Sequence, residues 1–302
     1  QGAAAGQLDR PSGVAVSDDG DVYVADTFND RVERFTADGR FVAAFGAPGS
    51  GRGQLERPWG VATDAGGAVY VVDRGNNRVQ RYDRDGRFEA AWGSAGNGAG
   101  QLAAPAGVAL APDGSVYVVD RGNHRMQRFA PSGTFLGAWG GVGSGLGQFI
   151  GPVGIAVAAD GTLYVADTGN DRVQRFGPDG RFVGAWGSYG DGPGEFLDPV
   201  GVAVGSDGSV YVSDAGNERI QRFDAAGAFR GQWGRPGRGD GEFNRPAGLA
   251  VAPDGTVYVA DSRNHRVQWF SPEGGFRGKV GTPGAGAGEF NRPEDVVVDG
   301  AD

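Results

Sequence analysis

The sequence predicts an all-β fold made of repeated four-stranded antiparallel sheets. Three observations support this: an internal repeat of constant length, four short apolar runs in each repeat, and turn residues between the runs. A unit of 40–50 residues with four antiparallel strands is typical of a propeller blade, so six complete copies predict a six-bladed β-propeller. The repeat is marked by proline every 47 residues, at Pro11, Pro58, Pro105, Pro152, Pro199, Pro246 and Pro293.

The fourth repeat shows the expected strands of one unit in order. They are Ile155–Val157, Leu163–Ala166, Val173–Phe176 and Phe182–Trp186. These runs are rich in Val, Tyr and Phe, the residue types that strands favour. No segment of the chain has both the period and the length of a helix.

Turn residues separate the runs of this unit. Asp160-Gly161 lies between the first and second strands, and Asp179-Gly180 between the third and fourth. Asp-Gly between apolar runs predicts a hairpin, because glycine adopts a positive φ without steric cost. The middle gap has the pattern D-x-x-N-x-R. A glycine-rich linker, here 187–200, leads to the next unit.

We expect one domain over residues 1–302, with six full repeats and a partial seventh copy of the first-strand motif. Val14–Val16 and Val296–Val298 share the same repeat phase and compete for one place in a six-bladed ring. One copy is therefore surplus, frayed or an edge cover, or the ring closes by exchange of the termini.

Composition narrows the functional classes. Hydrophobic residues make up 39% of the 302 residues, which is enough for a core and argues against disorder. The absence of cysteine excludes disulfides, thiolate metal sites and a cysteine nucleophile. No apolar run approaches the length of a membrane span. The net charge of −9 argues against nucleic acid as the partner. We expect a monomer.

Each unit carries an aspartate and an arginine at the two ends of its middle hairpin. Because the pair occurs in every blade, we interpret it as structural, with ligand contact as the alternative. A charge-assisted pair at partial exposure would contribute about 0.5–1 kcal/mol. The asparagine between them is expected to adopt a left-handed conformation. The pairs are Asp26 and Arg31, Asp73 and Arg78, Asp120 and Arg125, Asp167 and Arg172, Asp214 and Arg219, and Asp261 and Arg266.

The tryptophans of the fourth strands form another column of the repeat. Trp92, Trp139, Trp186 and Trp233 recur in it, with Phe45 and Val280 replacing them in two blades. We interpret this column as packing between blades. Sugar binding is the alternative.

Departures from the repeat identify a candidate binding surface. The linkers and the middle hairpins lie on one face, here called the linker face. On blades one to three this face gathers aromatic and basic residues, which are enriched in binding hot spots. Acidic residues cluster on the same face of blades four and five. Neutral variation of exposed loops is the alternative. The candidate partner-binding residues, here called the arginine–aromatic patch, are Phe28, Arg52, Arg57, Trp59, Arg74 and Arg121.

The expected first strands offer little for catalysis or metal binding. Thr63 is their one polar residue, and hard cations need several oxygen ligands. His124 and His265 occupy the same column in blades three and six, too far apart in a ring to share one zinc ion. We expect no catalytic residue, metal or cofactor. A small-ligand or enzymatic site at the channel mouth near Trp59 and Thr63 is the alternative.

The repeating unit resembles the NHL repeat. The resemblance rests on P-x-G-V-A-V, V-Y-V-A-D, N-x-R-V-Q-x-F, D-G-x-F and G-x-x-G-x-G-x-F, and it covers nearly the whole chain. His124-Arg125-Met126 and His265-Arg266-Val267 approach the Asn-His-Leu signature that names the family. The resemblance implies a six-bladed propeller. An amidating lyase of the family is similar in architecture only, because its zinc–histidine cluster and disulfides have no counterpart here.

The resemblance also implies a binding or scaffold role. Similar domains serve as extracytoplasmic sensor parts of bacterial serine/threonine kinases, or as substrate- and RNA-binding ends of eukaryotic proteins. An excess of arginine over the single lysine favours a bacterial source. We therefore expect a non-catalytic module that binds a protein or peptide, as the sensor part of a larger bacterial protein. The alternatives are a hydrolase- or lyase-like enzyme, an RNA-binding propeller, and an engineered or recently amplified repeat without an evolved ligand.

Overall fold

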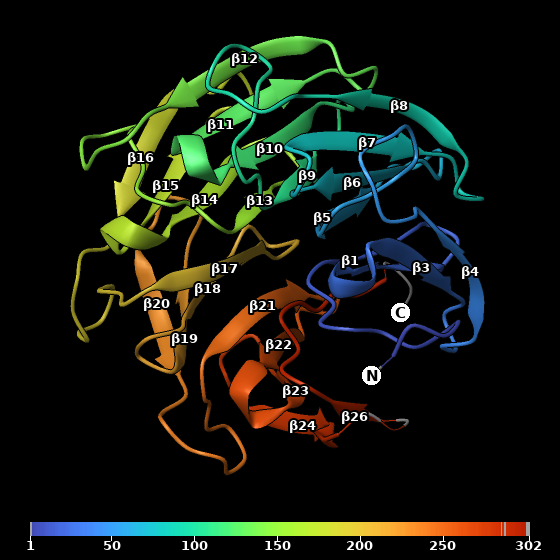
Figure 1. Cartoon of the computed structure of the whole chain (residues 1–302). Helices are drawn as coiled ribbons and strands as arrows, with labels where there is room; N and C mark the ends of the chain where they lie inside the picture. Colours follow the sequence, from blue (N-terminus) through green and yellow to red (C-terminus); the bar gives the residue numbers. More distant parts are fainter. Residues whose placement is uncertain (1, 285, 287, 300–302) are drawn as a thin grey trace. The chain divides into compact units, whose positions relative to one another are not determined.

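The computed structural model describes residues 2–284, 286 and 288–299, which form six four-stranded sheets. Within each sheet the four strands follow one another along the chain and pair antiparallel (Figure 1). The chain divides into two compact units, Gln1–Gly141 and Val142–Asp302, and each holds three of the sheets. The predicted fold class is therefore confirmed: an all-β propeller fold with six blades of four strands each.

Unit 1 contains blades 1 to 3. Blade 1 is β1 (Val14–Val16), β2 (Val22–Asp26), β3 (Arg31–Phe35) and β4 (Phe41–Phe45). Blade 2 is β5 (Pro58–Thr63), β6 (Val69–Asp73), β7 (Arg78–Tyr82) and β8 (Phe88–Trp92). Blade 3 is β9 (Val108–Leu110), β10 (Val116–Asp120), β11 (Arg125–Phe129) and β12 (Phe135–Gly140).

Unit 2 contains blades 4 to 6. Blade 4 is β13 (Ile155–Val157), β14 (Leu163–Asp167), β15 (Arg172–Phe176) and β16 (Phe182–Trp186). Blade 5 is β17 (Pro199–Val204), β18 (Val210–Asp214), β19 (Arg219–Phe223) and β20 (Phe229–Trp233). Blade 6 is β21 (Pro246–Val251), β22 (Val257–Asp261), β23 (Arg266–Phe270) and β24 (Phe276–Val280), followed by the short parallel pair β25 (Thr282–Pro283) and β26 (Glu289–Phe290).

The strands of blade 4 lie where the sequence predicts them, with one difference. The second strand extends to Asp167 and the third begins at Arg172, because these two residues pair with each other across the hairpin. Both predicted Asp-Gly turns are present. Gly161 and Gly180 have φ of 83° and 81°, which a residue with a Cβ atom adopts only at a cost.

The middle hairpin has a different left-handed residue from the one predicted. In blade 1 the asparagine of the repeat, Asn29, lies in a 3-10 turn, Thr27–Asn29. The next residue, Asp30, has the positive φ, at 54°. The prediction for the asparagine column was therefore wrong by one position. The left-handed column is Asp30, Asn77, His124, Asp171, Glu218 and His265.

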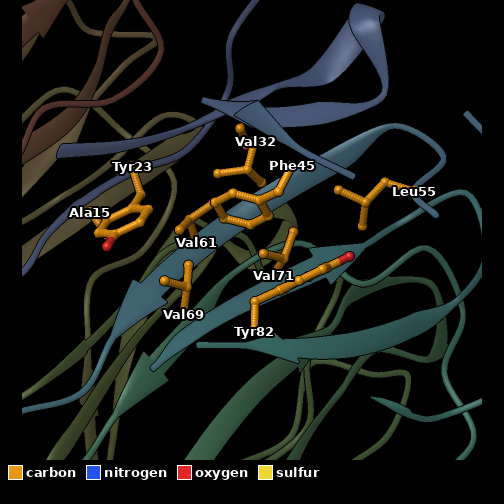
Figure 2. Packing of buried hydrophobic residues seen from close by; sticks show 10 residues of the cluster. Ala15, Tyr23, Val32, Phe45, Leu55, Val61, Val69, Val71 and Tyr82 are labelled. Carbon is orange, nitrogen blue, oxygen red and sulfur yellow. The ribbon is translucent and has the colours of Figure 1, made fainter. Parts of the chain in front are cut away.

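Aromatic side chains pack neighbouring blades together within each unit. The ring of Phe45 lies 4.9 Å from that of Tyr82, centroid to centroid, and joins blade 1 to blade 2. In blades 2 to 5 tryptophan takes the place of Phe45. Trp186 of blade 4, for example, packs against Phe223 of blade 5 with ring centroids 5.6 Å apart, so this column packs blades together. Figure 2 shows Phe45 and Val32 facing three valines of blade 2: Val61, Val69 and Val71.

The two terminal copies of the first-strand motif have different structures. Val14–Val16 forms β1 and pairs with β2. Residues 296–298 belong to no strand, and the preceding segment runs beside β21, where the Glu294 carbonyl accepts a hydrogen bond from Gly248 N at 2.9 Å. The N-terminal copy is therefore the one that completes blade 1. Within the described part of the chain, no helix is long and apolar enough to cross a membrane.

Candidate functional site

Beneath the linker face, each hairpin is organised around a buried aspartate. In blade 2, Asp73 Oδ1 accepts from Glu56 N at 2.7 Å. Its Oδ2 accepts from Arg78 Nε at 2.7 Å and from Gln80 Nε2 at 3.0 Å. Asn76 Nδ2 donates to both oxygens, at 3.0 and 2.9 Å. A carboxylate that is fully buried thus has its acceptor capacity satisfied.

Arg78, the ion-pair partner of Asp73, extends the network to the linker that precedes blade 2. Its guanidinium donates at 2.7–2.9 Å to three backbone carbonyls, those of Ser50, Gly51 and Gln54. Linker and hairpin are therefore held together by charge-assisted hydrogen bonds. The pair is structural in its contacts.

The same ion pair occurs in all six blades, with N–O distances of 2.7–2.8 Å. The expectation of partial exposure was wrong for the carboxylates, whose side chains have no exposed surface, and the arginines are only 6–16% exposed. The linker covers the hairpin, which accounts for the burial. The pairs are Asp26–Arg31, Asp73–Arg78, Asp120–Arg125, Asp167–Arg172, Asp214–Arg219 and Asp261–Arg266.

The structure brings several residues of the arginine–aromatic patch together. Phe28, in the 3-10 turn of blade 1, is 46% exposed. The Arg57 guanidinium lies 5.8 Å from the centroid of its ring. Arg57 reaches blade 1 because its backbone N–H donates to Asp30 Oδ1 at 2.7 Å. This contact fixes the start of β5 against the neighbouring hairpin.

A second cation–π pair lies in blade 2. Trp59 belongs to β5 and Arg74 follows β6, and the pairing of Pro58 with Asp73 makes the two side chains neighbours. The Arg74 guanidinium lies 4.3 Å from the centroid of the Trp59 ring. Trp59 is partly exposed, beneath this guanidinium.

Positive charge is concentrated around Arg74. Burial, with further contributions from the nearby Arg121 and Arg57 guanidinium groups, lowers the pKa of Arg74 from its usual value. The group still carries its charge at neutral pH, because arginine titrates far above 7. Three guanidinium groups therefore repel one another on this part of the linker face.

Two residues change the composition of the patch from the one predicted. Arg52 is exposed in its linker, and no contact joins its side chain to the rest of the patch in the described structure. Arg10, which sequence reasoning missed, lies 4.7 Å from the Phe28 ring centroid. Arg10 precedes Pro11 as Arg57 precedes Pro58, so the repeat alignment held the signal.

Other polar groups singled out from the sequence have structural contacts. Thr63 Oγ1 donates to the Val16 carbonyl at 2.8 Å and so joins β5 to β1, the first strands of blades 2 and 1. His265 Nδ1 accepts from Arg292 N at 3.3 Å. Among the described residues, no group of three or more His, Asp and Glu side chains could hold a metal ion.

The blades, the hairpin network and the repeat length define the class of protein as a six-bladed β-propeller. The chain belongs to the NHL-repeat family. The NHL repeat profile matches residues 8–35, 55–82, 102–129, 149–176, 196–223 and 243–270, more than half of the chain. No curated protein sequence matches it.

Solved structures of similar fold include enzymes. A streptogramin B lyase structure has a TM-score of 0.76 and 14% identity, over 98% of this chain and 88% of that one. Virginiamycin B lyase from Staphylococcus aureus, in a structure with quinupristin, gives 0.71 and 16% over 90% and 85%. Kuenenia stuttgartiensis hydrazine synthase gives 0.74 and 14% over 97% and 90%. Likeness at this level of identity is likeness of fold.

Proposed function

We propose that this chain is a non-catalytic binding module whose arginine–aromatic patch contacts a protein or peptide. The observation that carries the proposal is the pair of cation–π contacts, Arg57 with Phe28 and Arg74 with Trp59, on the linker face of unit 1. Aromatic and arginine side chains supply most of the energy at protein interfaces. Here they are attached to a rigid network, which lowers the entropy lost on binding.

The proposal treats the chain as non-enzymatic because the polar groups near the patch already have structural partners. The Thr63 hydroxyl donates to a backbone carbonyl, and Asp30 accepts from Arg57 N. In line with the family resemblance, we further propose that the module is monomeric and acts as the extracytoplasmic sensing part of a larger bacterial protein.

A peptide-display selection tests the binding proposal. A library of random 12-residue peptides is selected on the chain and then sorted on Trp59→Ala. As a matched control we choose Tyr189→Ala, because Tyr189 is an aromatic residue of unit 2 that is 74% exposed. We expect enriched peptides to bind Trp59→Ala at least about tenfold more weakly and Tyr189→Ala unchanged, since truncation of a hot-spot tryptophan costs 2 kcal/mol or more.

Thermal unfolding of the same variants completes this test. Trp59→Ala should unfold within about 2 °C of the parent chain, as partly exposed residues outside the core usually do. A large loss of stability would make Trp59 part of the core. An absence of any peptide that depends on Trp59 would contradict the binding proposal itself.

A further inference from the structure

The arginines of unit 1 fall into two sets. Arg34, Arg81 and Arg128, for example, each form an ion pair with an aspartate or glutamate. The same holds for Arg31, Arg40, Arg78, Arg84, Arg87 and Arg125. Among the described residues of unit 1, the arginines that form no ion pair are Arg10, Arg52, Arg57, Arg74 and Arg121.

All of the unpaired arginines lie on the linker face, and three of them lie over the two aromatic rings. Arg10 and Arg57 lie by Phe28, Arg74 lies by Trp59, and Arg121 is close enough to Arg74 to affect its pKa. Arg74 is also partly buried, so it has given up hydration without gaining a carboxylate. An anion placed here would remove both the repulsion and part of the desolvation cost.

We infer that the partner is an acidic peptide segment whose aspartate or glutamate carboxylates pair with Arg74 and Arg121 while an apolar side chain packs against Phe28 and Trp59. This inference rests on the proposed function. A guanidinium group binds a carboxylate through two parallel hydrogen bonds, which adds geometric selectivity to the charge attraction.

Two observations favour a peptide over a nucleic acid. A phosphate chain needs an extended basic track. Here the exposed carboxylate of Glu56 lies beside Arg57 in the sequence, and the chain carries a net charge of −9.

The peptides that depend on Trp59 in the display selection provide the first test. Their content of aspartate and glutamate should exceed that of the unselected library. The strongest binder is then synthesised with its acidic residues and, separately, with the matching amides in their place. We expect the amide version to bind at least about tenfold more weakly, with the difference shrinking as salt rises.

Charge-removing variants provide the second test. Arg121→Gln, at an exposed position, and Arg74→Gln should each weaken the acidic peptide several-fold and leave the amide version unchanged. Arg87→Gln is the matched control, because Arg87 is 75% exposed but already paired with Asp83 and Asp85. It should change neither affinity.

The outcomes separate this inference from the proposed function. Peptides that depend on Trp59 but show no acidic enrichment, or that bind equally well as amides, would overturn the inference and leave the binding module standing. Tighter binding of a ten-nucleotide oligothymidylate than of the acidic peptide would also overturn it, in favour of a nucleic-acid partner. If the selection yields no peptide that depends on Trp59, both the inference and the proposed function are overturned.

Discussion

Two neighbouring residues of blade 2, Asp73 and Arg74, belong to regions with opposite properties. Asp73 is fully buried, accepts hydrogen bonds from four residues, and has an equivalent in every blade. Arg74 is partly exposed, forms no ion pair within the described chain, and shares its residue type only with Arg121 in that column. The comparison teaches that repetition marks what the fold needs, while departures from it mark what a partner could use.

Unit 2 shows the same column without the patch. There, Thr168, Ala215 and Ser262 stand in the place of Arg74, and Val200 stands in the place of Trp59. The column that holds Arg57 in blade 2 holds Asp198 in blade 5. The pKa of the neighbouring Asp171 is raised by burial and by the negative charges of Asp198 and other carboxylates. In the columns of Trp59 and Arg74, unit 2 thus offers a partner neither an aromatic ring nor a positive charge, although Tyr189 is exposed in one of its linkers and Arg245 and Arg263 remain on its linker face.

The largest expected effect comes from removing the buried carboxylate of the network. Asp73→Ala leaves the Arg78 guanidinium and the other donors without their acceptor, so we expect it to lower the free energy of unfolding by about 3–5 kcal/mol. Urea denaturation followed by tryptophan fluorescence measures the change.

The control for this substitution is Asp85→Ala. Asp85 is 52% exposed and pairs with Arg87 and Arg34 at the surface, so its loss should change stability by less than about 1 kcal/mol. Equal effects of the two substitutions would mean that the buried network contributes no more than a surface pair.

Much of the network was predictable from repeat spacing, but its burial was not. Asp73 and Arg78 recur in fixed columns, so their pairing followed from the hairpin alone. Their burial depends on carbonyls of the preceding linker, such as that of Ser50, which lies 28 residues before Arg78. Every residue type supplies the same backbone carbonyl, so the residue at position 50 does not indicate this contact in the sequence.

The patch was predictable only in part for a similar reason. Phe28, Trp59 and Arg74 stand out because they break a column, and sequence comparison between blades finds such breaks. Arg10 was not predicted, although it stands in the same column as Arg57, because it lies before Pro11, where the first complete repeat begins. The contact between Arg57 and Phe28 depends on the positive φ of Arg57, 49°, which no residue pattern announced.

A moderate effect is expected at the one departure within the network itself. Blade 1 has Glu33 where the other blades have Gln80, Gln127, Gln174, Gln221 and Gln268. Glu33 Oε1 accepts from Gly6 N at 3.2 Å and pairs with Arg31 at 2.8 Å. Its Oε2 is buried without a hydrogen-bond partner. At the equivalent position of blade 2, the Gln80 side-chain nitrogen donates a hydrogen bond to the buried Asp73.

We expect Glu33→Gln to raise stability by about 1 kcal/mol at pH 7, because one buried hydrogen bond is restored. Burial raises the pKa of Glu33. Between the pKa of the unfolded state and that of the folded state, the folded chain therefore holds a proton that the unfolded chain has released. The native chain should therefore lose stability as pH rises from the ordinary glutamate pKa of about 4.3 through the raised folded value. The gain from Glu33→Gln should shrink below that range.

The reciprocal substitution, Gln80→Glu, is the matched control for this effect. It places the same carboxyl group in blade 2 and should lower stability, more at pH 7 than at pH 4. Calorimetric melting of both variants across this range measures the difference. A gain that does not change with pH would show that Glu33 is ionised when folded and held by Arg31.

The smallest effect is expected where the patch replaces a structural contact. In blades 1 and 4 the residue after the buried aspartate is a threonine. Its hydroxyl donates at 2.8 Å to the carbonyl of the proline that begins the first strand of the following blade, as Thr27 does to Pro58 and Thr168 to Pro199. Arg74 has no such hydroxyl. Arg74→Thr should gain about 1 kcal/mol from a hydrogen bond to the Pro105 carbonyl and lose about 0.5–1 kcal/mol of cation–π contact with Trp59.

Relief of the repulsion from Arg57 and Arg121 adds a few tenths of a kcal/mol, so the net change should be a gain of about 0.5 kcal/mol together with loss of peptide binding. Denaturation and peptide titration of the same sample measure both. Thr168→Arg, the reverse change in unit 2, should lose about 1 kcal/mol and gain no binding, because Val153 stands in the place of the tryptophan in blade 4. If Arg74→Thr instead lowered stability by more than 1 kcal/mol, the Arg74–Trp59 contact would belong to the fold, and the distinction between Asp73 and Arg74 would fail.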